Sequence, residues 1–354
     1  MPGYRDMRVL FRLLLLSCVM LLVPLPLTAQ GIAQEHAKEQ VQRQQDQPLN
    51  NAPVWRDVRG GENPYQTTQV RGIETKVLVQ TEGEIWRQIR NGPITIYGGW
   101  LIVAICAIIA AIYFLMGPIK LHQKPSGRTI ERFNYFERVT HWTMGISFCL
   151  LGITGLIILF GKYVLLPMSG YTLFSWLAIL SKNVHNFVAP VFVISLLVFI
   201  VVYIKDNLPE KGDLAWISQG WRMFAGAHLP SGRFNAGEKV WFWLGVVALC
   251  LVVSASGLIL LFPNFEQGRL LMQQANVIHA IAGVLVIGLS LGHIYMGTIG
   301  VEGAYQNMRT GNTDEIWAKE HHEYWYDEVK HLGRSPGGAP SAARASAMKE
   351  GWKL

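Results

Sequence analysis

The sequence predicts an all-α membrane protein whose helices cross the bilayer several times. Of its 354 residues, 51% are hydrophobic and only 16% are charged, whereas about 25% are charged in ordinary globular chains. Five stretches without any Asp, Glu, Lys or Arg are each long enough for a spanning helix of about 20 residues. They cover residues 91–119, 141–161, 183–204, 240–265 and 270–301. Because they are continuously apolar, the sequence excludes a soluble enzyme with one large aqueous core and argues against a β-barrel.

The N-terminal region predicts an exported segment. Arg5, Arg8 and Arg12 precede the apolar run LLLLSCVMLLVPLPL, which is typical of a signal peptide over residues 1–30, or of an uncleaved signal anchor. Residues 31–93 begin with a glutamine-rich stretch and are predicted to form a partly disordered periplasmic arm. The arm contains no catalytic motif, and because a lone segment of about 40 residues rarely folds unaided, we interpret it as a docking surface for exported partners.

Basic residues orient the predicted helices. An extra N-terminal transmembrane helix at 94–118 would lead inward, and the two short loops that then face inside carry five Lys or Arg each. The two short outer loops carry two and one. Cytoplasmic loops are enriched in Lys and Arg, so the net charge of +7 indicates topology and not nucleic-acid binding. We expect a multi-pass protein of the bacterial inner membrane, in contact with lipid, with residues 305–354 as a cytoplasmic tail.

The four cysteines form no metal-binding or haem-attachment motif. Cys18, Cys106, Cys149 and Cys250 all lie in apolar segments, and no CxxC occurs. The sequence therefore predicts neither an iron–sulfur cluster nor covalent haem attachment in this chain.

Four of the ten histidines lie within the apolar stretches, where an ionisable side chain is costly and indicates function. His141 follows Arg138 near the predicted inner face, and His185 follows Lys182 near the outer face. His279 and His293 share one helix, 14 residues apart, which places them on one face about 21 Å apart along the axis.

These depths pair His185 with His279 and His141 with His293. Two imidazoles from facing helices at each depth are what two stacked b-type haems require. A proton relay is the alternative, but it favours carboxylates within the spans, and there are none. A zinc site would need three or four ligands at one depth. By contrast, the sequence AKEHHEYWYDEV around His321, His322 and Glu323 is interpreted as a solvated or partner-facing inner helix.

Several stretches of the sequence resemble the membrane cytochrome b (gamma) subunit of respiratory formate dehydrogenases. They are ERFNYFERVTHWTMGISF, NVHNF, FNAGEKVWFW and NVIHAIAGVLVIGLSLGHIYMGTIGVEGAY, all within residues 115–330. The resemblance implies a transmembrane four-helix di-haem cytochrome b domain at 119–304, with an outer haem on His185 and His279 and an inner haem on His141 and His293. The first 117 residues go beyond the minimal pattern of the family.

The resemblance also implies partners and a reaction. A periplasmic iron–sulfur subunit would receive electrons from a molybdenum or tungsten subunit that oxidises formate, and this chain would pass them to menaquinone or ubiquinone in the respiratory chain. The family's quinone pocket matches Asn235 and Gly237, although Asn235 also suits a helix N-cap. The alternatives are a cytochrome b of a hydrogenase or another molybdoenzyme, and a non-haem membrane anchor or transporter.

Overall fold

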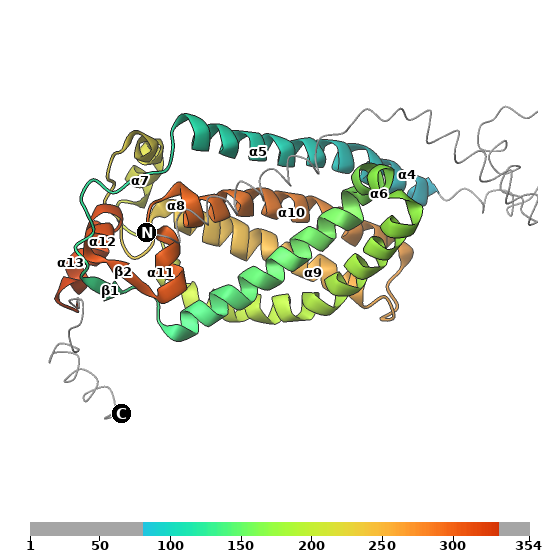
Figure 1. Cartoon of the computed structure of the whole chain (residues 1–354). Coiled ribbons are helices and arrows are strands. Elements are labelled where there is room, and N and C mark those ends of the chain that lie inside the picture. Colours follow the sequence, from blue (N-terminus) through green and yellow to red (C-terminus); the bar gives the residue numbers. More distant parts are fainter. Residues whose placement is uncertain (1–80, 333–354) are drawn as a thin grey trace, which may run out of the picture.

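A computed structural model describes residues 81–332. The signal segment, the periplasmic arm up to residue 80 and the end of the C-terminal tail lie outside the described residues. Long helices run side by side along most of the molecule, and short helices and strands gather at one end (Figure 1). The longer helices and the segments that continue them are α4 (Thr81–Ile89), η2 (Arg90–Ile94), α5 (Thr95–Leu115), α6 (Tyr135–Tyr203), α8 (Ala236–Val240), η5 (Trp241–Leu249), α9 (Cys250–Leu261), α10 (Arg269–Tyr295) and η6 (Met296–Gly300).

Within residues 81–332, four helical segments are long and apolar enough to cross a membrane. They are Gly83–Leu115, Tyr135–Tyr203, Ala236–Leu261 and Arg269–Gly300. Their outward surfaces expose large apolar side chains, such as Trp100 and Phe114 on α5 and Trp176 on α6. In water such a surface would be costly, whereas in a bilayer it faces lipid tails. The chain is therefore a helical multi-pass membrane protein.

The 69 residues of α6 would extend about 100 Å if the helix were straight, three times the thickness of the hydrocarbon core. The helix instead reverses at Gly170, whose φ of 72° and ψ of 172° are not helical, and two arms run back along each other (Figure 1). Glycine tolerates this positive φ because it has no Cβ. The apolar stretches 141–161 and 183–204 predict an outer loop between them, whereas the structure keeps residues 162–182 helical except at the reversal.

Three apolar clusters hold the helices together. The largest joins the second arm of α6 to η5, α9 and α10 through Leu196, Phe242 and Val286, among others. A second packs Ile102 and Cys106 of α5 against Phe160 of α6 and Val284 of α10, and a third packs α5 against the end of α10. Helix α5 thus lies along α10, on the outside of the helices that carry the histidines.

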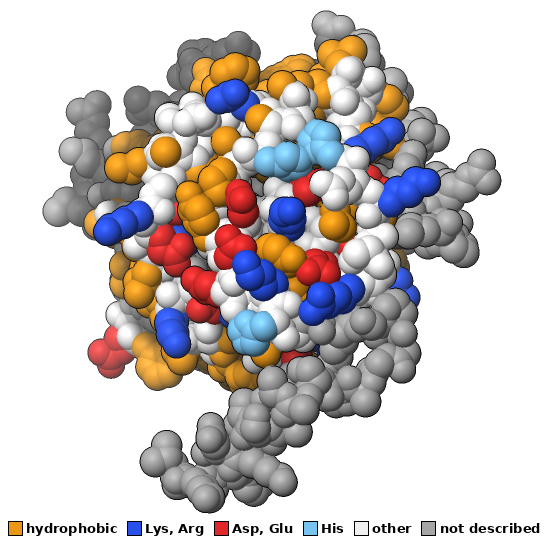
Figure 2. Space-filling view, turned by 90° about the vertical axis from the view of Figure 1, so that its left-hand side faces the viewer, with side chains coloured by type: hydrophobic (Ala, Val, Ile, Leu, Met, Phe, Trp, Pro, Cys, Tyr) orange, Lys and Arg blue, Asp and Glu red, His pale blue; other side chains and the backbone are white. Residues whose placement is uncertain are grey.

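The end of the molecule with the short elements is called the loop end below. Its elements are β1 (Thr129–Glu131), η3 (Lys205–Asn207), α7 (Asp213–Gln219), η4 (Gly220–Ala225), α11 (Ala304–Thr310), β2 (Asn312–Asp314), α12 (Glu315–His321), α13 (Glu323–Val329) and η7 (Lys330–Leu332). Strands β1 and β2 pair antiparallel, with Ile130 opposite Thr313. Figure 2 looks onto this end, where charged side chains and histidines gather. The described part of the predicted tail therefore packs against the loops between the spans.

Candidate functional site

The histidines of the apolar helices lie in two facing pairs. The ring centroids of His141 and His293 are 6.3 Å apart, and those of His185 and His279 are 6.1 Å apart. His141 lies on the first arm of α6 and His185 on the second, whereas α10 carries both His279 and His293. One helix therefore contributes a side chain to each pair, at positions about 21 Å apart along its axis.

The spacing within each pair fits a metal held between two imidazoles. Metal–nitrogen bonds of about 2 Å, added to roughly 1.1 Å from each nitrogen to its ring centre, would separate the centroids by about 6 Å. A direct hydrogen bond between the rings would need nitrogen atoms about 3 Å apart, and no such bond joins either pair among the described residues. The donor set of two neutral nitrogens is the one that a low-spin haem takes.

His185 and His279, the predicted outer pair, are oriented by hydrogen bonds that Nδ1 donates. In His279, Nδ1 lies 2.9 Å from the carbonyl oxygen of Val253, which can only accept, so Nδ1 carries the proton. The hydroxyl of Thr154 donates to the Leu150 carbonyl, and its oxygen lies 2.9 Å from Nδ1 of His185. Both outer histidines thus keep Nε2 unprotonated, which is the form that binds a metal.

Two glycines leave room beside the same rings. A Cβ added to Gly257 would lie 3.0 Å from Cε1 of His279, and one added to Gly155 would lie 3.4 Å from Cε1 of His185. The hydroxyl residues that face these histidines directly precede the glycines, Thr154 before Gly155 and Ser256 before Gly257. A hydroxyl–glycine dipeptide therefore flanks each of these histidines, from the first arm of α6 for His185 and from α9 for His279.

The inner pair has a different environment. Trp241, the first residue of η5, stacks on His293 with a centroid distance of 5.0 Å and an interplanar angle of 14°. Nδ1 of His141 is buried and has no hydrogen-bond partner among the described protein atoms. Two π-helical segments lie beside this pair: η5 begins at Trp241, and η6 begins at Met296, three residues after His293. Such segments are frequent at functional sites.

Asn235 and Gly237 lie at the start of α8, at the loop end. The side chain of Asn235 accepts a hydrogen bond from the Glu238 amide at 3.0 Å, and the Glu238 carboxylate accepts one from the Asn235 amide at 2.8 Å. This capping box gives Asn235 the helix-capping role. A Cβ at Gly237 would lie 3.0 Å from Trp216. Trp241 follows Gly237 by four residues, so both lie on the same side of the helix.

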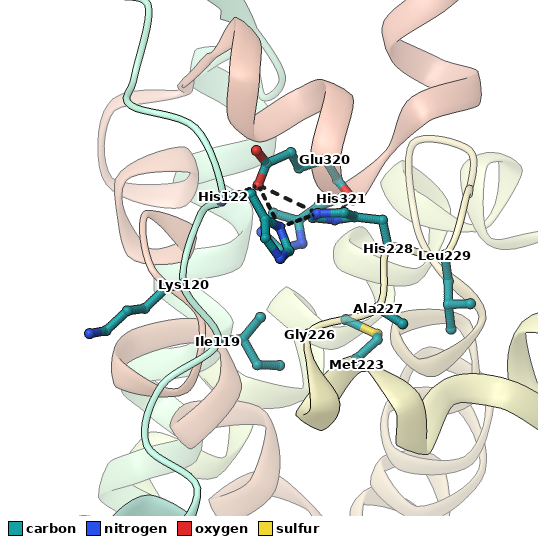
Figure 3. A pocket seen from close by; sticks show the side chains of 10 residues that line it. All are labelled: Ile119, Lys120, His122, Met223, Gly226, Ala227, His228, Leu229, Glu320 and His321. Carbon is teal, nitrogen blue, oxygen red and sulfur yellow. Dashed lines mark hydrogen bonds and ion pairs between the residues drawn. The ribbon is translucent and has the colours of Figure 1, made fainter.

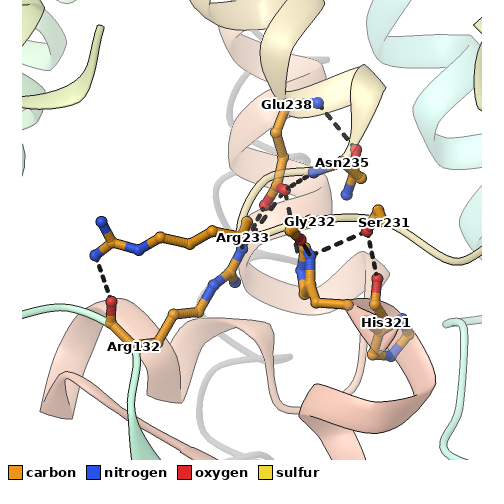
Figure 4. A network of polar contacts seen from close by, with 8 residues as sticks. Arg132, Ser231, Gly232, Arg233, Asn235, Glu238 and His321 are labelled. Atoms are coloured by element: carbon orange, nitrogen blue, oxygen red, sulfur yellow. Dashed lines mark hydrogen bonds and ion pairs between the residues drawn. The ribbon is translucent and has the colours of Figure 1, made fainter. Parts of the chain in front are cut away.

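A buried polar network surrounds this helix start (Figure 4). Arg132 is 5% exposed and pairs with Glu238 at 3.3 Å, and Arg233 pairs with Glu137 at 2.8 Å and with Asp206. Burial lowers the pKa of Arg132, against the opposing charge of Glu238. The network joins the start of α6 to the start of α8, close to the inner histidines.

His321 and His322 are buried, so the prediction of a solvated helix is wrong for these two residues. They are 9% and 1% exposed. Nδ1 of His322 donates to the Gly232 carbonyl at 2.8 Å, and burial lowers its pKa well below the usual value, with a further contribution from Arg132. The acceptor for His322 comes from a segment about 90 residues away, which the sequence around the histidines does not reveal.

The sequence pattern identified the four histidines but missed the residues that orient them. Thr154, Ser256 and Trp241 contact ring atoms of His185, His279 and His293. The only available signal was their position, because Thr154 and Ser256 each precede a glycine within an apolar helix. Hydroxyl residues in such helices commonly bond to their own backbone, as both also do here.

Comparison with known proteins relates this arrangement to formate dehydrogenase subunits. The chain is 28% identical over 208 residues to the nitrate-inducible formate dehydrogenase cytochrome b556(Fdn) subunit of Escherichia coli K12, covering 57% of this chain and 93% of that subunit. It is 29% identical over 211 residues to the formate dehydrogenase cytochrome b556(fdo) subunit of the same strain, covering 57% and 94%. A formate dehydrogenase cytochrome b556 subunit of Haemophilus influenzae is 26% identical over 203 residues, covering 54% and 79%.

A family model described as prokaryotic cytochrome b561 matches residues 132–311. The matched region includes both arms of α6, all of α9 and α10, and the four paired histidines. Because it takes in just over half of the chain, the chain belongs to the prokaryotic cytochrome b561 family, whose members are haem b-binding membrane electron carriers.

Proposed function

We propose that this chain is the di-haem cytochrome b subunit of a formate dehydrogenase complex. The main observation in support is that two histidines of α10 each face a histidine of α6. The ring centroids are 6.1 Å apart for His279 and His185, and 6.3 Å apart for His293 and His141. The names of the relatives support formate dehydrogenase as the parent complex. In this proposal 119–304 is the di-haem domain, α5 forms part of the extra transmembrane helix, and formate is oxidised on another subunit.

The outer haem would be held by His185 and His279, and the inner haem by His141 and His293. Haem b with two imidazole ligands supplies reversible one-electron chemistry at its iron. The residues of this chain fix the two sites. Hydrogen bonds from Nδ1 aim the outer imidazoles, the stacked indole of Trp241 orients His293, and α10 sets the distance between the sites.

Quinone is proposed to be reduced at the loop end, beside the inner histidines. Gly237 lies on the same side of its helix as Trp241, which stacks on His293. Asn235 keeps its amide NH₂ free of the capping bond, which uses only its side-chain oxygen and its backbone N–H. That NH₂ can donate to a quinone carbonyl. The basic residues of the loops support a cytoplasmic location for this end, so protons for the quinone would come from the inside.

The opposite end is proposed to meet a periplasmic iron–sulfur subunit that is reduced by a molybdenum or tungsten subunit. An open groove of about 430 Å³ lies there between α4, α9 and α10, lined by Trp86 and Asn276 among others. Trp86 donates to the side-chain oxygen of Asn276 at 3.2 Å, and Asn276 precedes His279 by one helical turn. The described end of the arm therefore lies beside the outer pair, where an electron donor would dock.

Haem stoichiometry in the four single His→Ala variants tests the proposal. The wild-type chain should contain two haems b, and each variant should lose the haem whose ligand is removed. The variants that lose the outer haem should differ in absorption spectrum from those that lose the inner haem. Two haems retained in His141→Ala and His293→Ala would contradict the pairing, and the absence of a reduced b-type absorption band would contradict haem binding altogether. Reduction of the assembled complex by formate but not by hydrogen separates formate dehydrogenase from a hydrogenase.

A further inference from the structure

A second group of histidines lies at the loop end, together with Glu320 (Figure 3). His122 comes from the segment between α5 and β1, His228 from the segment after η4, and Glu320 from α12. One possible ligand atom of each residue lies within 4.8 Å of those of the other two. These three positions are more than 90 residues apart in sequence, so only the fold brings them together.

His228 is oriented as a ligand. Its Nδ1 lies 2.9 Å from the carbonyl oxygen of Glu320, and since a carbonyl only accepts, Nδ1 carries the proton. Nε2 is therefore the unprotonated nitrogen, and it faces Nδ1 of His122. A second nitrogen fixed by a backbone carbonyl is typical of metal-binding histidines, because it sets both the tautomer and the direction of the ring.

Glu320 is held in place from the backbone. Its carboxylate oxygens accept hydrogen bonds from the amides of His122 at 3.0 Å and Gln123 at 3.1 Å. One of these oxygens also lies 3.8 Å from Nδ1 of His122 and 3.9 Å from Nε2 of His228. The side chain of Glu320 is 7% exposed, so its negative charge is placed in a largely buried position that a cation would neutralise.

The same residues line a small cavity of about 10 Å³, which is room for one water molecule or ion. His321 also lines this cavity, and its Nε2 is buried without a hydrogen-bond partner among the described residues. The side chains of His122 and His228 are 53% and 40% exposed. An ion could thus enter from the aqueous side of the loop end and replace the direct contact between Nε2 of His228 and Nδ1 of His122.

We propose that His122, His228 and Glu320 bind a divalent transition-metal ion of the zinc type. Two imidazole nitrogens and one carboxylate oxygen form a donor set that zinc accepts, with water or Nε2 of His321 in the fourth position. Magnesium and calcium are disfavoured because they prefer oxygen ligands. The bound ion would link three parts of the loop end: the segment after α5, the segment after η4, and α12. It would thereby stabilise their packing beside the buried polar network.

Zinc binding to the full chain in its detergent-purified complex tests the site. The complex is prepared with a histidine-free tag, stripped with a chelator, and titrated with Zn²⁺. We expect one zinc per chain by elemental analysis, with X-ray absorption showing nitrogen and oxygen ligands at about 2.0–2.2 Å and no sulfur. Less than 0.2 zinc per chain, on the order of background, or sulfur ligation would overturn the proposal.

Matched variants locate the ion. His122→Ala and His228→Ala should each weaken zinc binding at least tenfold, on the order of the loss expected when a metal-site contact is removed. His331→Ala removes a histidine of the exposed segment η7 and should leave binding unchanged. Haem content, measured in every sample, should stay at the wild-type value, because none of the three variants changes a paired histidine. Equal zinc affinity in His228→Ala and His331→Ala would refute the site while leaving the haem proposal intact.

Discussion

The indole of Trp241 lies parallel to the imidazole of His293, 5.0 Å from it between centroids. The face of an aromatic ring carries negative charge and stabilises a neighbouring positive charge. An oxidised haem iron bound by His293 would carry one more positive charge than the reduced iron. The stacked indole is therefore expected to favour the oxidised state of the inner site.

Trp241→Leu should raise the midpoint potential of the inner haem and leave the outer haem unchanged. An aromatic contact of about 0.5–1.5 kcal/mol corresponds to a shift of up to about 60 mV for one electron. Potentiometric titration followed by visible absorption measures both haems in one sample. Trp176→Leu, at an exposed position of α6, is the control and should shift neither. Equal shifts in both variants would show that the stacking has no specific effect.

Gly257→Ala should reduce occupancy of the outer haem more than Gly155→Ala does. The added Cβ would approach Cε1 of His279 to 3.0 Å in the first case and Cε1 of His185 to 3.4 Å in the second, so only the first requires the ring to move. Gly145→Ala adds a methyl group with no atom within 4 Å and is the control. The pyridine haemochrome spectrum gives the haem content per chain of each variant. A loss of haem in Gly145→Ala as large as that in Gly257→Ala would contradict the prediction.

Thr154→Val should weaken haem binding at the outer site, on the order of 10–100-fold, because Nδ1 of His185 loses the hydroxyl oxygen that lies 2.9 Å from it. Ser256→Ala should have a smaller effect, since Nδ1 of His279 keeps the Val253 carbonyl at 2.9 Å. Haem-loss rates to an apo-globin acceptor compare the two variants directly. A larger effect for Ser256→Ala would mean that the carbonyl does not hold His279.

Arg233→Met should destabilise the loop end strongly. Arg233 donates to the Glu137 carboxylate at 2.8 Å and to the Arg132 carbonyl at 2.5 Å. Removing it leaves the mostly buried carboxylate of Glu137 without its ion-pair partner, which costs about 3 kcal/mol of folding stability. The midpoint of thermal unfolding in detergent should fall by roughly 6–12 °C.

Lys330→Met is the control for that experiment. It removes the exposed pair between Lys330 and Asp327 at 3.1 Å, and such surface pairs contribute less than about 1 kcal/mol. Its unfolding midpoint should stay within roughly 2–4 °C of the wild-type value. If both variants unfold at the same temperature, the Arg233–Glu137 pair does not stabilise the loop end.

The parts of the fold that follow from local pattern could be predicted from the sequence. Charge-free stretches predicted the long helices, and helical periodicity placed His279 and His293 on one face. Lys162 and Lys182 interrupt the charge-free stretches and so predict a loop between them, whereas the chain stays helical there and reverses at Gly170, whose φ is positive. Asn235 was predicted to suit a cap, and the capping box with Glu238 confirms that role.

Contacts between distant segments could not be predicted. His122, His228 and Glu320 carry no shared spacing, and they meet only because β1 pairs with β2 and draws α12 to the segment after α5. The burial of His321 and His322 has the same origin. Their local sequence is polar, and the partners come from a distant segment: the Gly232 carbonyl accepts from Nδ1 of His322, and the Ser231 hydroxyl donates to the His321 carbonyl.

Because α10 carries a histidine of each pair, the gap between the two sites tolerates no small insertion or deletion. Removing one residue between His279 and His293 would turn one histidine by about 100° relative to the other and point it away from its mate. A change of seven residues would restore the direction to within about 20°, but would alter the gap by roughly 10 Å. Relatives that keep both pairs should therefore preserve the length of this segment even where its residues diverge, which sequence alignment can check.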